Sequence, residues 1–205
     1  MKTLVILAHP DLAQSTVNRA WADALAQHPG RYTVHDLYRR YPDGRIDVAA
    51  EQALVDAHAA FVLQFPVYWF NCPPFLKQWL DDVLTHGWAY GSRATALVGK
   101  KAGIAVSLGT PAADYRADGA VGCTVAAALR PFELTLRYCR AAWQPLFHWH
   151  GIDSNAAYGD SARAAVHKAR WITSPIWRAT IPEQPQTPVK RCVDIGQPFI
   201  APAVG

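Results

Sequence analysis

Cysteine is scarce in this sequence, and no long apolar run occurs. Four cysteines are scattered, with neither the paired spacing of a disulfide framework nor the close spacing of a metal site: Cys72, Cys123, Cys139 and Cys192. We therefore expect reduced thiols in a cytoplasmic protein. The sequence has no membrane-spanning run and no signal-peptide pattern at its N-terminus. At 205 residues, of which 51% are hydrophobic, the chain is expected to bury a full core.

Charge is also limited, at 18% of the residues and a formal net charge of +4. Basic residues occur as isolated pairs, such as Arg39-Arg40 and Lys100-Lys101, and do not form a stripe. This distribution argues against a nucleic-acid partner.

Several ligand motifs are missing. No G-x-G-x-x-G follows the first apolar run, which disfavours a Rossmann dinucleotide site, and no G-x-x-x-x-G-K-[ST] is present, which excludes a P-loop. His148 and His150 would share one face of a strand, but no third ligand accompanies them at a suitable spacing. We therefore predict no metal site.

Short apolar runs alternate with helical patterns along most of the chain. Strands are predicted at 3–7, 32–35, 59–63, 103–106 and 143–149, and helices at 16–27, 47–57, 74–84, 131–139 and 154–170. Five parallel strands with helical crossovers predict a single α/β domain over 1–170, a flavodoxin-like doubly wound sheet of strand order 2-1-3-4-5. Segment 110–129 is expected to be a functional loop containing a helical piece. Six of the 15 prolines lie in 171–205, which predicts a Pro-rich C-terminal extension, either lying over a neighbouring surface or disordered.

Three loops follow the first, third and fourth predicted strands: 8–18, 65–70 and 107–110. Loops that leave the carboxyl ends of parallel strands meet at one crevice, where ligands bind. The first loop ends in Ser15-Thr16 at a predicted helix N-terminus, whose free N–H groups and positive dipole suit a phosphate. Ordinary helix capping also accounts for Ser15, so both interpretations stay open.

Three stretches of the chain carry a family resemblance: Leu7-Ala8-His9-Pro10 with Ser15 and Asn18, 64–70 with 73–79 and Asp81, and 86–91. Over residues 1–150 the chain resembles the flavodoxin-fold NAD(P)H:quinone oxidoreductases. The match is closest to the branch containing the ancillary subunit of glutathione-regulated potassium-efflux systems, which shares the stretch 41–47.

The resemblance implies a homodimer with two flavin sites at the interface, holding FMN or, alternatively, FAD. NAD(P)H is the implied co-substrate, and a quinone or similar two-electron acceptor is the implied substrate. The implied flavin contacts are His9, Ser15, Thr16, Val17 and Asn18 at the phosphate, Pro66, Val67, Tyr68, Trp69 and Phe70 along the ring, and Ser107, Leu108, Gly109 and Thr110 at its pyrimidine edge. Tyr90 and Tyr115 are the implied catalytic residues. Trp88 and Tyr90, which we expect to be exposed, would reach over the partner's flavin.

The third loop and the segment that follows it depart from the family pattern. Val121 stands where many relatives have a histidine that can donate a proton, and Leu108 and Thr110-Pro111 replace the usual threonine and glycine. Pro111 also removes one N–H group. We expect flavin binding to survive and quinone reduction to be weakened.

For three of these residues an interpretation without a role in flavin binding or catalysis also stays open. His9 could be a capped loop histidine, Trp69 plain interface packing and Tyr115 an exposed loop residue. A second function also stays open, in which the protein is a flavin-binding regulatory subunit that contacts the cytosolic domain of a membrane antiporter. That partner would place it at the inner face of the membrane.

Overall fold

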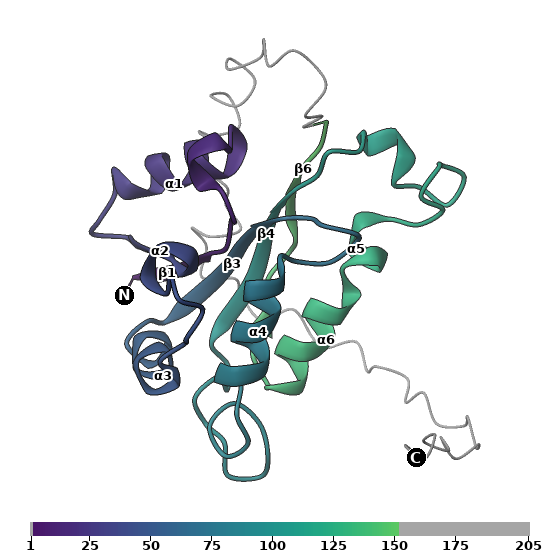
Figure 1. Ribbon diagram of the computed structural model, residues 1–205. Coiled ribbons are helices and arrows are strands. Elements are labelled where there is room, and N and C mark those ends of the chain that lie inside the picture. Colours follow the sequence, from purple (N-terminus) through teal and green to yellow (C-terminus); the bar gives the residue numbers. More distant parts are fainter. Residues whose placement is uncertain (1, 152–205) are drawn as a thin grey trace, which may run out of the picture.

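Six parallel strands form the centre of the structure, a computed structural model that describes residues 2–151 (Figure 1). They are β1 Thr3–Leu7, β2 Tyr32–Asp36, β3 Ala60–Pro66, β4 Lys101–Ser107, β5 Ala142–Trp143 and β6 Phe147–Trp149. Their order is β2-β1-β3-β4-β5, with β6 also pairing with β4. The predicted flavodoxin-like order is therefore confirmed.

The central strand β3 is buried along its whole length and pairs with β1 on one side and β4 on the other. Seven residue pairs join it to β4, from Ala60 opposite Lys101 to Pro66 opposite Ser107. A strand covered on both faces has no polar side, which explains why all of its residues except Gln64 are apolar. The register brings the carboxyl ends of β3 and β4 to the same height.

The predicted fifth strand over 143–149 is wrong as a single element. The structure divides it into β5 and β6, both paired with β4. Trp143 lies opposite Ala102, and Phe147 lies opposite Ala105. Between these two pairs the edge strand contains one residue more than β4 does. Pro145 falls in this interval and has no N–H for the ladder, which explains a bulge there.

The helices are α1 Val17–Ala26, α2 Leu37–Arg40, α3 Val48–Asp56, α4 Pro74–Val83, α5 Val125–Ala128 and α6 Arg130–Tyr138, with 3-10 turns η1 Leu12–Gln14 and η2 Ala112–Asp114. The sequence predicted the four longest of these helices, with slightly different bounds. It did not predict the short α2, whose first turn is capped by Asp36. Segment 110–129 contains η2 and α5, as expected of a loop with a helical piece.

Helices cover both faces of the sheet. On one face, side chains of α3, α4 and α6 pack against alternate strand residues, including Ile6, Leu63 and Ile104. On the other face, Val17 and Trp21 of α1 lie in the same core cluster as Val62 and Ala105. The predicted helix 154–170 and the predicted extension 171–205 lie outside the described residues. No helix within residues 2–151 is long and apolar enough to span a membrane.

A buried carboxylate ties α3 to its neighbours. Glu51 is almost completely buried and accepts hydrogen bonds from His35 at 2.8 Å, from the Tyr41 hydroxyl at 2.7 Å and from the Trp79 indole at 2.8 Å. Burial alone would raise the pKa of Glu51, but these three hydrogen bonds outweigh it and the pKa is lowered. The carboxylate is therefore held charged inside the fold.

Candidate functional site

The loops after β1, β3 and β4 enclose a cavity of about 360 Å³. Ligand pockets of about 300–1,000 Å³ are usual for small molecules, so a cofactor fragment fits here. The lining residues are His9, Asp11, Gln14, Ser15, Thr16, Val17, Asn18, Pro66, Val67, Tyr68, Ser107, Leu108 and Gly109. The crevice thus lies where the sheet topology places it, beside the switch between β1 and β3.

A smaller hollow of about 190 Å³ adjoins the first. It is lined by Val67, Trp69, Phe70, Leu108, Gly109, Thr110 and Tyr115, and it shares three of these with the larger cavity. Each of the residues that the sequence assigned to a flavin lines one of the two hollows. The structure therefore brings the predicted flavin contacts together, while the contacts themselves stay a prediction.

The N-terminus of α1 presents free donors to the larger cavity. Ser15 Oγ accepts from the N–H of Asn18 at 3.1 Å, so the capping interpretation of Ser15 is confirmed. Thr16 makes no side-chain cap hydrogen bond, and the N–H groups of Thr16 and Val17 have no acceptor in the described part of the chain. These donors and the helix dipole suit an anion.

His9 lines the same end of the cavity. Its Nδ1 accepts from the N–H of Asp11 at 3.1 Å, and burial lowers its pKa despite the nearby carboxylate of Asp11. A neutral ring that accepts at Nδ1 carries its hydrogen on Nε2. His9 is therefore both a loop-capping residue and a potential Nε2–H donor.

Asn18 is buried and joins three elements. Its Nδ2 donates to Ser107 Oγ at 2.8 Å, and the side chain of Gln64 donates to its backbone carbonyl at 2.9 Å. The amide of Asn18, predicted as a phosphate donor, thus already holds α1 against β3 and β4. Asn18 therefore also helps to hold the loops that line the cavity in fixed positions relative to one another.

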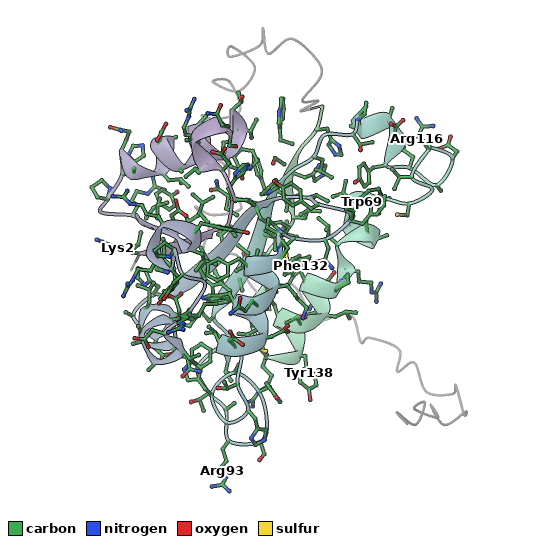
Figure 2. The ribbon with its side chains drawn as sticks, in the orientation of Figure 1. Lys2, Trp69, Arg93, Arg116, Phe132 and Tyr138 are labelled. Carbon is green, nitrogen blue, oxygen red and sulfur yellow. The ribbon has the colours of Figure 1, made fainter. Side chains whose placement is uncertain are left out.

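Two aromatic side chains rise from a strained turn between β3 and α4. Trp69 and Phe70 have φ values of 47° and 60°, and the turn is closed by two hydrogen bonds between the backbones of Tyr68 and Asn71, at 2.8 and 2.9 Å. Left-handed backbone is unfavourable for such residues, which makes the turn a candidate functional feature. Trp69 is 93% exposed, and Figure 2 shows it near the carboxyl ends of the strands.

Cys72 follows this turn and is buried. Burial raises the pKa of its thiol to about 11. The thiol is therefore protonated at neutral pH.

Tyr115, which directly follows η2, lines the smaller hollow. Only 8% of the residue is exposed, so the interpretation of Tyr115 as an exposed loop residue is wrong. Its ring lies 6.5 Å from that of Phe70 and 5.4 Å from that of His150, measured between centroids. Burial raises the pKa of Tyr115, which keeps the phenol protonated and able to donate.

Trp88 and Tyr90 lie away from both hollows of their own chain. Both are partly buried, so the prediction of two exposed aromatics is wrong: Trp88 packs against the main core and donates to Asp56 at 3.2 Å, which a sequence pattern does not reveal. The ring of Tyr90 lies 5.8 Å from that of Tyr138, at the opposite end of the sheet from Trp69 (Figure 2). An approach to a partner's flavin stays a prediction.

Sequence reasoning missed three residues near the site. Asp11, the N-cap of η1, and Gln14 within η1 line the larger cavity, and this turn is too short to leave a periodic pattern. His150 reaches the third loop, where its Nδ1 lies 3.0 Å from the carbonyl oxygen of Thr110. Its place directly after the predicted strand was visible in the sequence, but its contact with a loop 40 residues earlier was not. Within residues 2–151 no three histidine, cysteine or acidic side chains are grouped as metal ligands.

The parallel sheet, its strand order and its loop-lined crevice define a doubly wound α/β protein with a ligand site at the topological switch point. A family model described as "Flavodoxin-like fold" matches residues 1–172, and the chain belongs to this family.

Two relatives match most of the chain. It is 48% identical to the uncharacterized NAD(P)H oxidoreductase YrkL of Bacillus subtilis over 151 residues, covering 74% of this chain and 86% of that protein. It is 39% identical to the glutathione-regulated potassium-efflux system ancillary protein KefG of Salmonella paratyphi B over 177 residues, covering 85% and 94%. Both kinds of relative agree with the resemblance read from the sequence.

Two solved structures are similar as well. General stress protein 14 of Treponema denticola, solved in complex with FMN, is 60% identical with a TM-score of 0.77, covering 84% of this chain and 98% of that one. An NADPH-quinone reductase from P. pentosaceus is 31% identical with a TM-score of 0.73, covering 85% and 99%.

Proposed function

We propose that the protein is a flavin-dependent NAD(P)H oxidoreductase that binds FMN between its three loops and transfers a hydride to a quinone or a similar two-electron acceptor. The observation that carries the proposal is the pair of adjoining hollows, one with anion donors and the other with aromatic walls. FMN in the similar Treponema denticola structure supports this choice of flavin over FAD.

The phosphate would be held at the start of α1. Thr16 and Val17 offer backbone N–H groups that have no acceptor among the described residues, and His9 offers Nε2–H. The positive end of the helix dipole favours the same charge. This donor set supports a phosphate at the start of α1.

The polar edge of the flavin ring would meet the third loop. Leu108 already donates its N–H to the carbonyl of Trp149 at 2.8 Å, whereas the N–H groups of Gly109 and Thr110 have no acceptor in the described part of the chain. Pro111 has no N–H. These two backbone donors would stabilise the negative charge that develops on reduction.

The reacting face would lie in the smaller hollow. FMN, when bound, accepts a hydride from a nicotinamide and releases it to the acceptor. Trp69 and Phe70 supply flat apolar walls that admit one planar ring, and the protonated Tyr115 supplies a hydrogen bond to an acceptor oxygen. The chemistry that this chain adds is thus orientation, exclusion of water and a proton.

A homodimer is part of the proposal. A groove of about 690 Å³ runs between α4 and α6, and Leu134 and Tyr138 on its rim are exposed, Tyr138 to 72%. Exposed apolar surface of this kind suits a two-fold contact, which would place Tyr90 at the interface. The three cysteines in residues 2–151 carry free thiols, which agrees with the cytoplasm as the proposed location.

A second candidate function is favoured by the similarity to KefG, which covers nearly that whole protein. In this alternative the flavin-bound protein regulates a potassium-efflux antiporter by contacting its cytosolic domain. Binding of the purified protein to such a domain, with slow turnover of benzoquinone, would favour this function over the enzyme.

The absorption spectrum and the mass of the co-purified cofactor test the main proposal. We expect about one FMN per chain, bleached by NAD(P)H without oxygen and restored by a benzoquinone. A colourless protein that takes up neither FMN nor FAD on reconstitution would overturn the proposal.

A further inference from the structure

A buried chain of three polar side chains adjoins the larger cavity. Nε2 of Gln64 donates to the backbone carbonyl of Asn18 at 2.9 Å, and Nδ2 of Asn18 donates to Ser107 Oγ at 2.8 Å. Gln64, Asn18 and Ser107 are 0%, 1% and 5% exposed. Asn18 and Ser107 line the cavity, whereas Gln64 does not. Gln64 can therefore influence a ligand in the cavity only through its neighbours.

One half of the Gln64 amide is unpaired. A carbonyl only accepts, so the nitrogen of this amide faces Asn18 and the oxygen faces away. Oε1 of Gln64 is buried and has no hydrogen-bond donor within residues 2–151. An apolar side chain of the same length would avoid the cost of such an acceptor. In helix α1 the carbonyl of Asn18 also accepts from the N–H of Ala22, so it does not depend on Gln64. Stability therefore gives no reason for an amide at this position.

Asn18 links the two ends of the proposed flavin site. Its backbone N–H donates to Ser15 Oγ at 3.1 Å, and this bond closes the turn that presents the N–H groups of Thr16 and Val17. Its side chain holds Ser107, the last residue of β4 and the first of the third loop. The position of Asn18 thus sets the phosphate end of the site relative to the third loop.

Gln64 in turn ties Asn18 to the centre of the sheet. It lies in β3, opposite Leu7 of β1 and Ala105 of β4. Because β3 is buried and paired on both sides, it gives Asn18 a rigid support. Such a support matters for FMN, since the ring and the phosphate of one molecule must meet both ends of the site at once.

We propose that Gln64 is a positioning residue for FMN, which acts through Asn18 and keeps the phosphate donors of α1 at the distance from the third loop that the flavin requires. The inference rests on the proposed function, because it takes FMN to bind between the loops. It gives a role to a buried residue that lies outside the lining of both hollows.

The test is Gln64→Met, because methionine is about as long as glutamine but has no amide hydrogen to donate to Asn18. The binding of FMN and of riboflavin, which lacks the phosphate, is measured from the quenching of flavin fluorescence by flavin-free protein. The Kd of riboflavin divided by the Kd of FMN then reports the contribution of the phosphate. Urea unfolding of the flavin-free variants reports any structural effect separately.

Gln144→Met is the matched control. Gln144 is also a buried glutamine whose Oε1 has no donor in the described part of the chain, and its Nε2 donates to the carbonyl of Ala142 at 2.9 Å. Its backbone N–H donates to Ala102, near the start of β4, and the residue lines neither hollow. The two substitutions thus make the same chemical change at opposite ends of β4.

We expect Gln64→Met to lower the ratio of the two Kd values about tenfold, the factor that one net hydrogen bond is worth, and to leave the Kd of riboflavin within about twofold of the parent. The urea midpoint should stay at or above that of the parent, because the substitution removes an unpaired acceptor. Gln144→Met should leave the ratio unchanged. An unchanged ratio in Gln64→Met, an equal loss for both flavins, a lower urea midpoint, or an equal change in the control would overturn the proposal.

A second variant covers the case in which Gln64→Met does not fold. Gln64→Asn keeps a buried amide but is one methylene shorter, so it should lose the bond to Asn18 and lower the ratio as much as methionine does. A parent protein that binds neither flavin would refute the proposed function. A parent that binds FMN, with variants of Gln64 that keep its preference over riboflavin, would refute this inference alone.

Discussion

Replacing Trp69 by asparagine is expected to make the flavin-free protein more stable and acceptor reduction slower. A left-handed backbone costs a residue such as tryptophan about 1–2 kcal/mol, whereas asparagine adopts it at much lower cost. Trp69 has a φ of 47° and is 93% exposed, so the substitution removes strain and gives up almost no buried area.

We therefore expect the free energy of unfolding to rise by about 1 kcal/mol, or Tm by about 2–4 °C for a domain of this size. The measurement is urea and thermal unfolding of flavin-free protein, because bound FMN would add its own stabilisation. Trp69→Phe is the matched control: it keeps both the strain and an aromatic wall, so its stability and its KM for a benzoquinone should stay near those of the parent.

The two halves of this prediction can fail independently. If Trp69→Asn is no more stable than Trp69→Phe, the strained turn is not a store of free energy. If its KM for the quinone does not rise, the indole ring does not form a wall of the substrate slot. Both results together would favour the alternative that Trp69 serves plain interface packing.

The remaining predictions concern the proton, the fold and the assembly. Tyr115→Phe should slow reoxidation by benzoquinone and leave flavin reduction unchanged, and Val121→His should speed reoxidation; stopped-flow traces unaffected by both would remove this loop from the substrate slot. Because the pKa of Glu51 is lowered in the folded state, its stabilisation is present above its unfolded value of about 4.3 and is lost as the pH falls through the folded pKa. Glu51→Gln should therefore flatten the dependence of unfolding free energy on pH below about 4.3, and an unchanged acid limb would contradict this. Light scattering should give a dimer for the parent, and Tyr138→Asp on the rim of the groove should weaken it; a flavin-bound monomer at micromolar concentration would refute the shared interface.

Strand positions and the site loops could be predicted from the sequence because they depend on local patterns. Apolar runs of strand length mark β1, β3 and β4, and parallel connection then dictates where the following loops meet. The three loops therefore meet at the two hollows, whereas the individual flavin contacts were implied by the family resemblance. Helix bounds were close since capping residues such as Ser15 are local signals.

The features that the sequence did not reveal depend on contacts between distant residues. The bulge near Pro145 depends on the register with β4, and the partial burial of Trp88, in the loop after α4, depends on contacts with distant residues such as Asp56 of α3. The left-handed turn at Trp69 and Phe70 contradicts local preference, since such turns usually carry Asn-Gly. Local propensity could not place two aromatic rings in that conformation.

The raised pKa of Cys72 has a consequence for chemical survival. Quinones are electrophiles, and they add covalently to thiolates. At a pKa of about 11, roughly one Cys72 side chain in ten thousand is a thiolate at neutral pH, and burial further limits access to it. A chain that passes hydride to such compounds a few residues from this sulfur would thus escape arylation by its own substrate.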